Sequence, residues 1–290
     1  MKRTYNPAGL SRVFGSRLIA FIYCFFISII FLIPLLWIFT SAFKVDVEIN
    51  QAGGFLLFPK TWTLNSFKEI LDPNNKQLPI FRWYQNSILV SATHSFLAVL
   101  IYSMSAFAYA KLKFRGREII FLVLLFLASF PAIINIIPLY RVMFNLRWLN
   151  TPMALIFPGL SGMFNIFLIR QFMYGIPDSL LESARIDGAG EGRTFVLIIM
   201  PLVRPILAAV ALFTFIGNWN DFLWPSIVIN NLDKLTLTAG LQLVKGIYGT
   251  TTISKLSAVG VVAVLPMIII YIFTQKFIIS GISISSGVKG

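Results

Sequence analysis

Residues 177–205, PDSLLESARIDGAGEGRTFVLIIMPLVRP, form a polar island between two long apolar runs of the chain. Only 12% of the chain is charged, yet this island contains Asp178, Glu182, Arg185, Asp187, Glu191, Arg193 and Arg204. Pro177 suits a helix start, where the N–H that proline lacks has no partner. Ser179 and Glu182 form a capping-box pattern, and Gly188 favours a helix end. The island therefore predicts a short polar helix in a loop between two apolar segments.

One face of this predicted helix carries very small side chains. Ala184 and Gly188 lie one turn apart, so that another protein surface could approach the helix closely there. The simpler interpretation is a solvated helix that only connects two membrane spans. Spacing alone does not decide between these two interpretations.

The composition excludes a soluble globular domain. The chain of 290 residues is 57% hydrophobic and 15% aromatic, with a mean hydropathy of +0.82, whereas soluble domains are about half apolar. Several apolar runs exceed the roughly 20 residues that a helix needs to cross a bilayer. The net charge of +13 does not indicate a nucleic-acid partner, because the Lys and Arg residues are scattered over loops. We expect an all-α polytopic membrane protein.

The apolar runs predict six transmembrane helices within a single transmembrane domain that spans residues 1–290. Their predicted ranges are about 18–43, 86–110, 119–139, 153–172, 206–228 and 256–279. Lys and Arg without acidic residues precede the first span, and a basic cluster lies between Lys111 and Arg117. The positive-inside rule places both segments in the cytoplasm. Both termini are then cytoplasmic, residues 44–84 form an extracytoplasmic loop, and residues 177–205 form a cytoplasmic loop.

The sequence contains no pattern typical of an enzyme. His94 is the only histidine and Cys24 the only cysteine, and both lie in apolar runs. A single histidine there is more often an interhelical hydrogen-bond partner than a catalyst or a metal ligand. Arg170, at the inner end of the fourth span, is expected to snorkel towards water. We expect no catalytic residue, no metal site and no cofactor in this chain, and the chain has no phosphate-binding GxxxxGK[ST] loop.

Polar side chains inside two predicted spans are candidates for a substrate path. They are Asn165 in the fourth span and Asn218, Trp219, Asn220, Asp221 and Trp224 in the fifth. Exposing such groups to lipid costs several kcal/mol, so they should face the bundle interior or a water-filled path. Amides, a carboxylate and aromatic rings suit a sugar. The alternative is structural: tryptophans at the membrane interface, and Asn or Asp as links between helices.

The polar island resembles the EAA loop of the membrane subunits of binding-protein-dependent ATP-binding cassette (ABC) importers. The family pattern is E-A-A, three residues, G, nine residues, I-x-L-P. It corresponds here to Glu182-Ser183-Ala184, Gly188, Ile198 and Met200-Pro201. Ser183 and Met200 depart from the pattern but are similar in size to the usual residues. WNDFLWP at 219–225, the loop at 44–84 and the C-terminal SSGVKG are similar to the carbohydrate-uptake branch, which includes the maltose system.

The resemblance implies a type I ABC importer permease in a bacterial or archaeal cell membrane. It implies that the loop forms a coupling helix on a cytoplasmic ATPase and that the loop at 44–84 meets a solute-binding protein. The residues implied in ATPase coupling are Glu182, Ser183, Ala184, Asp187, Gly188, Pro201 and Lys289. The implied partners are a second permease subunit, two ATPase subunits that bind ATP and Mg, an extracytoplasmic solute-binding protein and a sugar. Gly188→Trp should abolish transport while membrane insertion continues.

Two alternatives to a sugar importer stay open at this point. The first is an ABC permease for a polyol or glycerol phosphate, although a phosphate would call for Arg or Lys along the path. The second, from a different class, is a secondary carrier that works without ATP. Such a carrier usually holds ionisable groups near the membrane midplane, and Asp221 is the best candidate for one.

Overall fold

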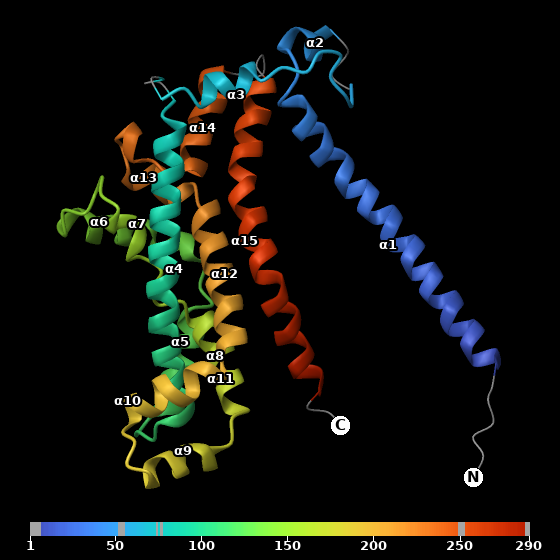
Figure 1. The fold of residues 1–290 in the computed structure, drawn as a ribbon. Helices are drawn as coiled ribbons and strands as arrows, with labels where there is room; N and C mark the ends of the chain where they lie inside the picture. The colour runs from blue at the N-terminus through green and yellow to red at the C-terminus, as the bar shows by residue number, and fades with distance from the viewer. Residues whose placement is uncertain (1–6, 52–55, 74, 76–77, 249–252, 288–290) are drawn as a thin grey trace. The chain divides into compact units, whose positions relative to one another are not determined.

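The structure, a computed structural model, describes residues 7–51, 56–73, 75, 78–248 and 253–287. All regular elements within these ranges are helical (Figure 1), which confirms the predicted all-α class. The chain divides into two compact units, each described here by itself. The first unit comprises Met1–Asp72 and Tyr248–Val262, and the second comprises Pro73–Ile247 and Ala263–Gly290.

The first unit contains one long apolar helix and a polar segment. Its elements are α1 (Pro7–Ser41), α2 (Asp46–Gln51), α3 (Asn65–Ile70) and the first residues of α15 (Ile253–Gly287). Residues Leu18–Ser41 of α1 have a mean hydropathy of 2.8, and none of its most apolar window is buried. A helix that is apolar on all sides suits a lipid environment. In the polar segment, the carboxylate of Asp46 accepts a hydrogen bond from Ser254 N at 3.0 Å.

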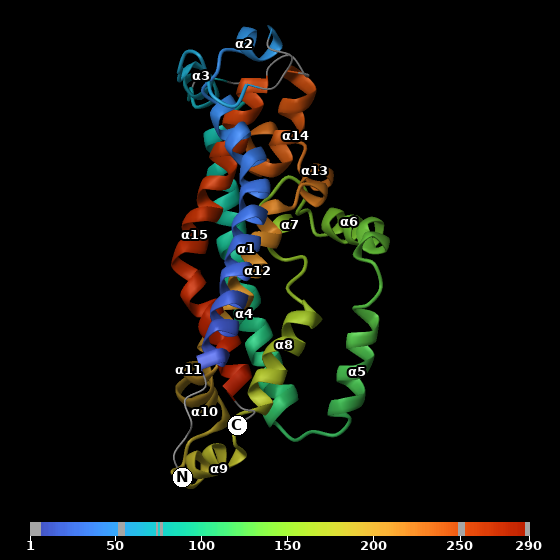
Figure 2. The same ribbon diagram turned by 90° about the vertical axis from the view of Figure 1, so that its right-hand side faces the viewer.

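The second unit contains the remaining helices. They are α4 (Ile80–Lys111), α5 (Arg117–Leu127), η1 (Ala132–Asn135), α6 (Ile136–Asn145), α7 (Met153–Ile156), α8 (Met163–Tyr174), α9 (Asp178–Ile186), α10 (Glu191–Thr194), the π-helix η2 (Phe195–Ile199), α11 (Met200–Leu202), α12 (Arg204–Asn220), α13 (Leu223–Val228), η3 (Leu232–Lys234) and α14 (Leu237–Tyr248). In Figures 1 and 2, α4 and α12 run side by side, and α9 lies across the direction of α4 at one end of this unit.

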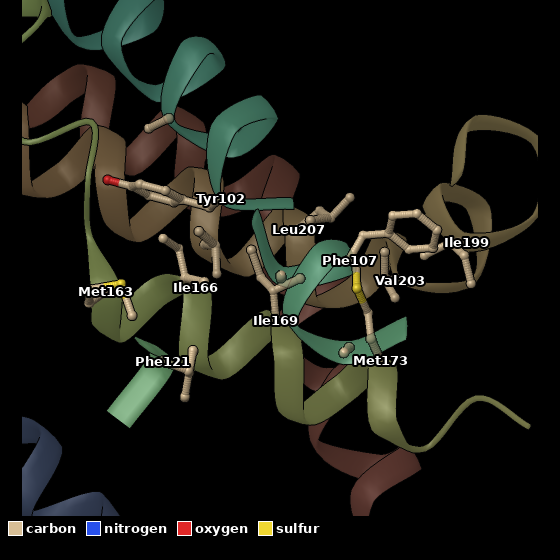
Figure 3. Packing of buried hydrophobic residues seen from close by; sticks show 14 of the residues in the cluster. Tyr102, Phe107, Phe121, Met163, Ile166, Ile169, Met173, Ile199, Val203 and Leu207 are labelled. Atoms are coloured by element: carbon tan, nitrogen blue, oxygen red, sulfur yellow. The ribbon is translucent and has the colours of Figure 1, made fainter. Parts of the chain in front are cut away.

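The helix α4 is the central element of the second unit. It packs against both α8 and α12. Small side chains along α4, such as Ala98 and Ala106, are fully buried and let the neighbouring helices approach closely. Larger residues fill the space between the three helices, as Figure 3 shows for Phe107, Ile169 and Met173. In lipid, packing of this kind contributes more to helix association than the hydrophobic effect does.

Three described helical stretches are long and apolar enough to cross a membrane: Leu18–Ser41, Ile80–Lys111 and Ile253–Gln275. Two bent pairs raise the number to five if each pair is one span. They are Arg117–Leu127 with Ala132–Asn145, at 88°, and Glu191–Leu202 with Arg204–Asn220, at 81°. The number of six spans and the side on which the termini lie remain predictions.

The stretch predicted as the fourth span, 153–172, is not one continuous helix. The described chain forms α7 and α8 there, separated by residues 157–162. Pro158 and Gly159 lie in this break, and Gly159 has a φ of +84°. Both residue types interrupt helices, proline by removing a hydrogen bond and glycine by favouring other backbone conformations.

Candidate functional site

The polar island folds into α9 as predicted, but the start of the helix differs from the prediction. Pro177 occupies the N-cap position with a ψ of 135°, so α9 begins at Asp178. Ser179 and Glu182 therefore lie inside the helix, and the predicted capping box is wrong. The hydroxyl of Ser183 donates to the carbonyl of Ser179 at 2.9 Å, one turn earlier.

The end of α9 is a complete Schellman motif, which confirms Gly188 as the helix terminator. Gly188 has a φ of +79°. Its N–H donates to Arg185 O at 3.0 Å, and the N–H of Ala189 donates to Ala184 O at 2.8 Å. Both bonds satisfy carbonyls that a helix end leaves unpaired. Beyond the turn, the Arg185 guanidinium pairs with Glu191 at 2.9 Å, which links α9 to α10.

The exposed surface of α9 is not the face of small side chains that the sequence predicts. Leu181 and Ala184 are buried within this chain, at 2% and 6% exposed. The expectation that Ala184 offers an open surface is therefore wrong for this chain, because its small side chain packs inward. Gly188 is exposed with open space around it. Ile186, at 86% exposed, is the most exposed apolar side chain of α9.

A buried lysine holds the start of α9. The ammonium of Lys111, the last residue of α4, donates to the carbonyl of Ile176 and to the carboxylate of Asp178, each at 2.6 Å. The Lys111 side chain is 4% exposed, whereas that of Asp178 is 76% exposed. The hydrogen bond from Lys111 holds the pKa of the Asp178 carboxyl below its ordinary value. The sequence indicated Lys111 only as part of a basic loop.

Arg170 does not snorkel to water, contrary to the prediction. Its side chain is 5% exposed and pairs with Glu118 at 2.6 Å. The guanidinium also donates to Tyr109 O at 3.2 Å and lies 3.9 Å from the centre of the Phe121 ring. The charge is thus satisfied inside the unit, by a carboxylate, a carbonyl and an aromatic face.

A recess of about 710 Å³ lies between α4, α8 and α12. Its polar lining consists of His94, Asn165, Thr214, Asn218, Asn220 and Asp221. Four of the residues predicted for the substrate path, from two predicted spans, therefore meet at one cavity. Asn218 accepts a hydrogen bond from Ser91 of α4 at 3.3 Å. The hydroxyl oxygen of Thr214 is buried without a hydrogen-bond partner among the described residues.

The two predicted tryptophans lie outside the lining of the recess. Trp219 is 2% exposed. It stacks on Phe215 and meets Tyr84 edge-on, with ring centres 5.7 Å apart in each pair. Trp224 donates its indole N–H to Ala154 O at 2.8 Å. The structural alternative thus describes both side chains better than the substrate path does.

Two lining residues were not predicted as part of the path. His94 contacts the carbonyl of Ile156 through Nδ1 at 2.6 Å, which confirms its expected role as an interhelical partner. It also borders the recess, and so does Thr214. The sequence signal for His94 was a single histidine in an apolar run, whereas Thr214 gave none.

Pro201 and Asp187, two of the residues predicted for ATPase coupling, do not line the recess. Pro201 is exposed in α11, directly after the π-helix. Asp187 is exposed at the end of α9. Lys289 lies outside the described residues, so its predicted position beside an ATPase stays a prediction.

Three relatives share most of the chain's length. An arabinooligosaccharides transport system permease protein of Halalkalibacterium halodurans is 35% identical over 266 residues, covering 91% of this chain and 94% of the relative. A diacetylchitobiose uptake system permease protein of Streptomyces coelicolor is 32% identical, with 88% and 84% covered. An sn-glycerol-3-phosphate transport system permease protein of Shigella flexneri is 30% identical, with 87% and 91% covered.

The fold matches a solved structure over nearly its whole length. That structure is a bacterial ABC transporter involved in the import of the acidic polysaccharide alginate. One of its chains is similar with a TM-score of 0.78 and 22% identity, covering 96% of this chain and 100% of that one. Residues 101–284 match the family of binding-protein-dependent transport system inner membrane components. This match spans α9 and every lining residue of the recess except His94, and the chain belongs to that family of transport permeases.

Proposed function

We propose that the chain is one of two membrane-spanning subunits of an ATP-driven importer for a sugar or oligosaccharide. In this proposal it forms half of the translocation path and couples to an ATPase through α9. Its partners are a second permease subunit, two cytoplasmic ATPase subunits that bind ATP and Mg, and an extracytoplasmic solute-binding protein. The chain itself is a transport subunit and not an enzyme.

The recess is the observation that carries the proposed substrate class. Three amides, from Asn165, Asn218 and Asn220, surround it together with one carboxylate, from Asp221. Amides and carboxylates form the paired hydrogen bonds that sugar hydroxyls accept and donate. Thr214 lines the same recess, with its hydroxyl oxygen buried. Burying these polar groups without hydrogen-bond partners would cost free energy, so a path filled with water or sugar is favoured.

The broken fourth span supports the same location for the path. Pro158 and Gly159, within the break between α7 and α8, both line the recess. Irregular backbone at membrane depth is tolerated where it borders a water-filled cavity. We therefore assign α7 and α8 to one interrupted crossing and count each bent pair as another crossing. This gives six crossings of a cell membrane, with both termini in the cytoplasm.

The exposed part of α9 supports the proposed coupling role. The helix ends in a fixed Schellman turn and presents Ile186 outward. An apolar side chain that projects from a polar helix suits a cleft on a partner protein. Closure of the ATPase subunits on ATP would then move α9 and switch the paired permeases between outward and inward openings.

A glycerol phosphate is the second candidate substrate, because one relative carries that name. Phosphate recognition favours Arg or Lys. The described lining of the recess includes neither, and Asp221 would repel an anion. The recess therefore favours a neutral saccharide over a phosphate ester. An ATP-independent carrier is the remaining alternative.

Purification of the tagged chain from its native membrane tests the proposal. We expect it to bring a second permease and an ATPase. In proteoliposomes, ATP hydrolysis should rise with a solute-binding protein loaded with arabinooligosaccharide or a related saccharide, and not with glycerol phosphate. Uptake without ATP by the chain alone would contradict the importer, whereas a response only to glycerol phosphate would contradict the sugar.

A further inference from the structure

The last residue of α4 holds the polypeptide on both sides of Pro177. Lys111 donates to the carbonyl of Ile176, one residue before the proline, and to the carboxylate of Asp178, the first residue of α9. One ammonium group therefore fixes the point at which the chain turns from α8 into α9. Pro177 itself has a fixed φ, here −59°, which restricts that turn further.

The burial of Lys111 separates it from an ordinary basic loop residue. Its side chain is 4% exposed, although lysines are seldom buried without a partner. Lys113, two residues later, is exposed, and no ion pair is recorded for it among the described residues. A positive charge that served only as a topology signal would need no such burial, because that signal depends on charge and not on contacts.

The helix that carries Lys111 also borders the recess. His94 lines the recess and Ser91 hydrogen-bonds to Asn218, both from α4. Lys111 follows His94 by 17 residues, or about 26 Å along a helix. The residues of α4 include neither Gly nor Pro, the usual causes of kinks. An uninterrupted helix therefore joins the recess to the start of α9.

We propose that Lys111 is a positioning residue that links movement of α9 to the recess through α4. The inference rests on the proposed importer function and adds a specific contact to it. When α9 moves with a partner, the two bonds from Lys111 oblige α4 to move with it, and Ser91 and His94 shift at the recess. Without these bonds, α9 could move while α4 stayed in place. ATP would then be hydrolysed with less solute transported.

The test measures ATP hydrolysed per solute imported by the reconstituted importer with its solute-binding protein. Lys111→Met keeps a long buried side chain but removes the donor. We expect this ratio to rise about fivefold or more, the lower range of coupling effects between sites. Lys111→Arg restores a donor and should stay within about twofold of the wild type. Lys113→Met removes the same charge two residues further along the chain and should leave the ratio unchanged.

A second variant keeps the test decisive if Lys111→Met does not assemble. Asp178→Ala removes the other half of the ion pair from an exposed position, and Lys111 keeps its bond to the carbonyl of Ile176, so the complex should still assemble. It should raise the same ratio while hydrolysis without binding protein, and the KM for the loaded binding protein, stay unchanged. A merely structural role would instead lower the amount of complex and all activities together.

The outcomes separate this inference from the proposed function. A wild-type complex that shows no ATP-driven uptake overturns the importer itself. Normal wild-type uptake combined with an unchanged ratio in Lys111→Met, or in Asp178→Ala when the first variant does not assemble, overturns only the link through Lys111. A raised ratio in Lys113→Met as well would show that charge alone is responsible, which also overturns it.

Discussion

Two regions of α4 differ in the chemistry of their contacts: its last turn, at Lys111, and its middle, at Ser91 and His94. At the α9 end, Lys111 pairs with Asp178 at 2.6 Å, and nearby Arg170 pairs with Glu118 at 2.6 Å. At the middle of the helix, beside the recess, Ser91 meets Asn218 at 3.3 Å, and the lining consists mainly of neutral groups. Charged hydrogen bonds are shorter and stronger than neutral ones. The last turn is therefore fixed by the chain itself, while in the proposed function the polar groups at the middle stay available for a transient ligand.

The largest expected effect is a loss of stability at a buried aromatic residue, which is compared with a residue that lines the recess. Trp219→Ala removes a ring that is almost fully buried, and we expect it to cost about 4 kcal/mol of unfolding free energy. Asn220, the next residue in the sequence, lines the recess. Asn220→Ala should therefore lower solute uptake with little loss of stability. Thermal unfolding in detergent and uptake in proteoliposomes measure the two effects. Equal stability losses would show that the two side chains do not differ in role.

The second effect tests the charged end directly. Arg170→Ala removes a buried cation with its ion pair and its aromatic contact, and we expect a loss of about 3 kcal/mol. Arg115→Ala is the matched control, because Arg115 is exposed. It should change stability by less than about 0.5 kcal/mol. Similar unfolding temperatures for both variants would mean that the buried ion pair does not fix this end.

A smaller effect is expected at the end of α9. Gly188→Ala places a side chain at a φ of +79°, which costs about 1 kcal/mol. Asn tolerates this conformation better, so Gly188→Asn should lose less. Nothing lies within 4 Å of the added Cβ, so the difference between the two variants reports backbone strain alone. Thermal unfolding of the two variants shows which of them is less stable. A higher stability of Gly188→Ala than of Gly188→Asn would contradict the left-handed turn.

The smallest effect concerns pH. The Lys111 ammonium lowers the pKa of Asp178 below its ordinary value of 3.8, with smaller contributions from Lys113 and Arg185. A carboxyl whose pKa is lower in the folded state stabilises it above the unfolded pKa, and this contribution disappears as the pH falls through the folded value. The exposed carboxylate keeps the effect small. The stability difference between the wild type and Asp178→Ala should thus stay constant from about pH 8 to 5. A change of this stability difference within that pH range would mean that another titratable group is responsible for the interaction.

Local features of α9 could be predicted from the sequence because they depend on neighbours along the chain. The polar island, its helix and the terminator Gly188 follow from residues within one or two turns. The grouping of Asn165 with Asn218 was predicted only as a shared tendency to avoid lipid, and the structure supplies the common cavity.

Several of the failures concern which way a side chain points. Ala184 packs inward and Trp219 points away from the recess, although each lies in the expected helix. Arg170 is buried because Glu118, 52 residues away in the sequence, reaches it. Such contacts depend on how separate helices pack, and composition or spacing within one segment carries no information on that packing.

The contact between Lys111 and Asp178 also has a consequence for biosynthesis. The two residues are separated by 67 positions. A ribosome that adds about 5–20 residues per second therefore makes Asp178 roughly 3–13 s after Lys111. During that interval α4 carries an ammonium group without its final partners, and a hydrated charge at the membrane surface resists being pulled across. With the proposed topology, the same lysine would first hold α4 in its orientation and later become enclosed, once the chain that covers it has been made.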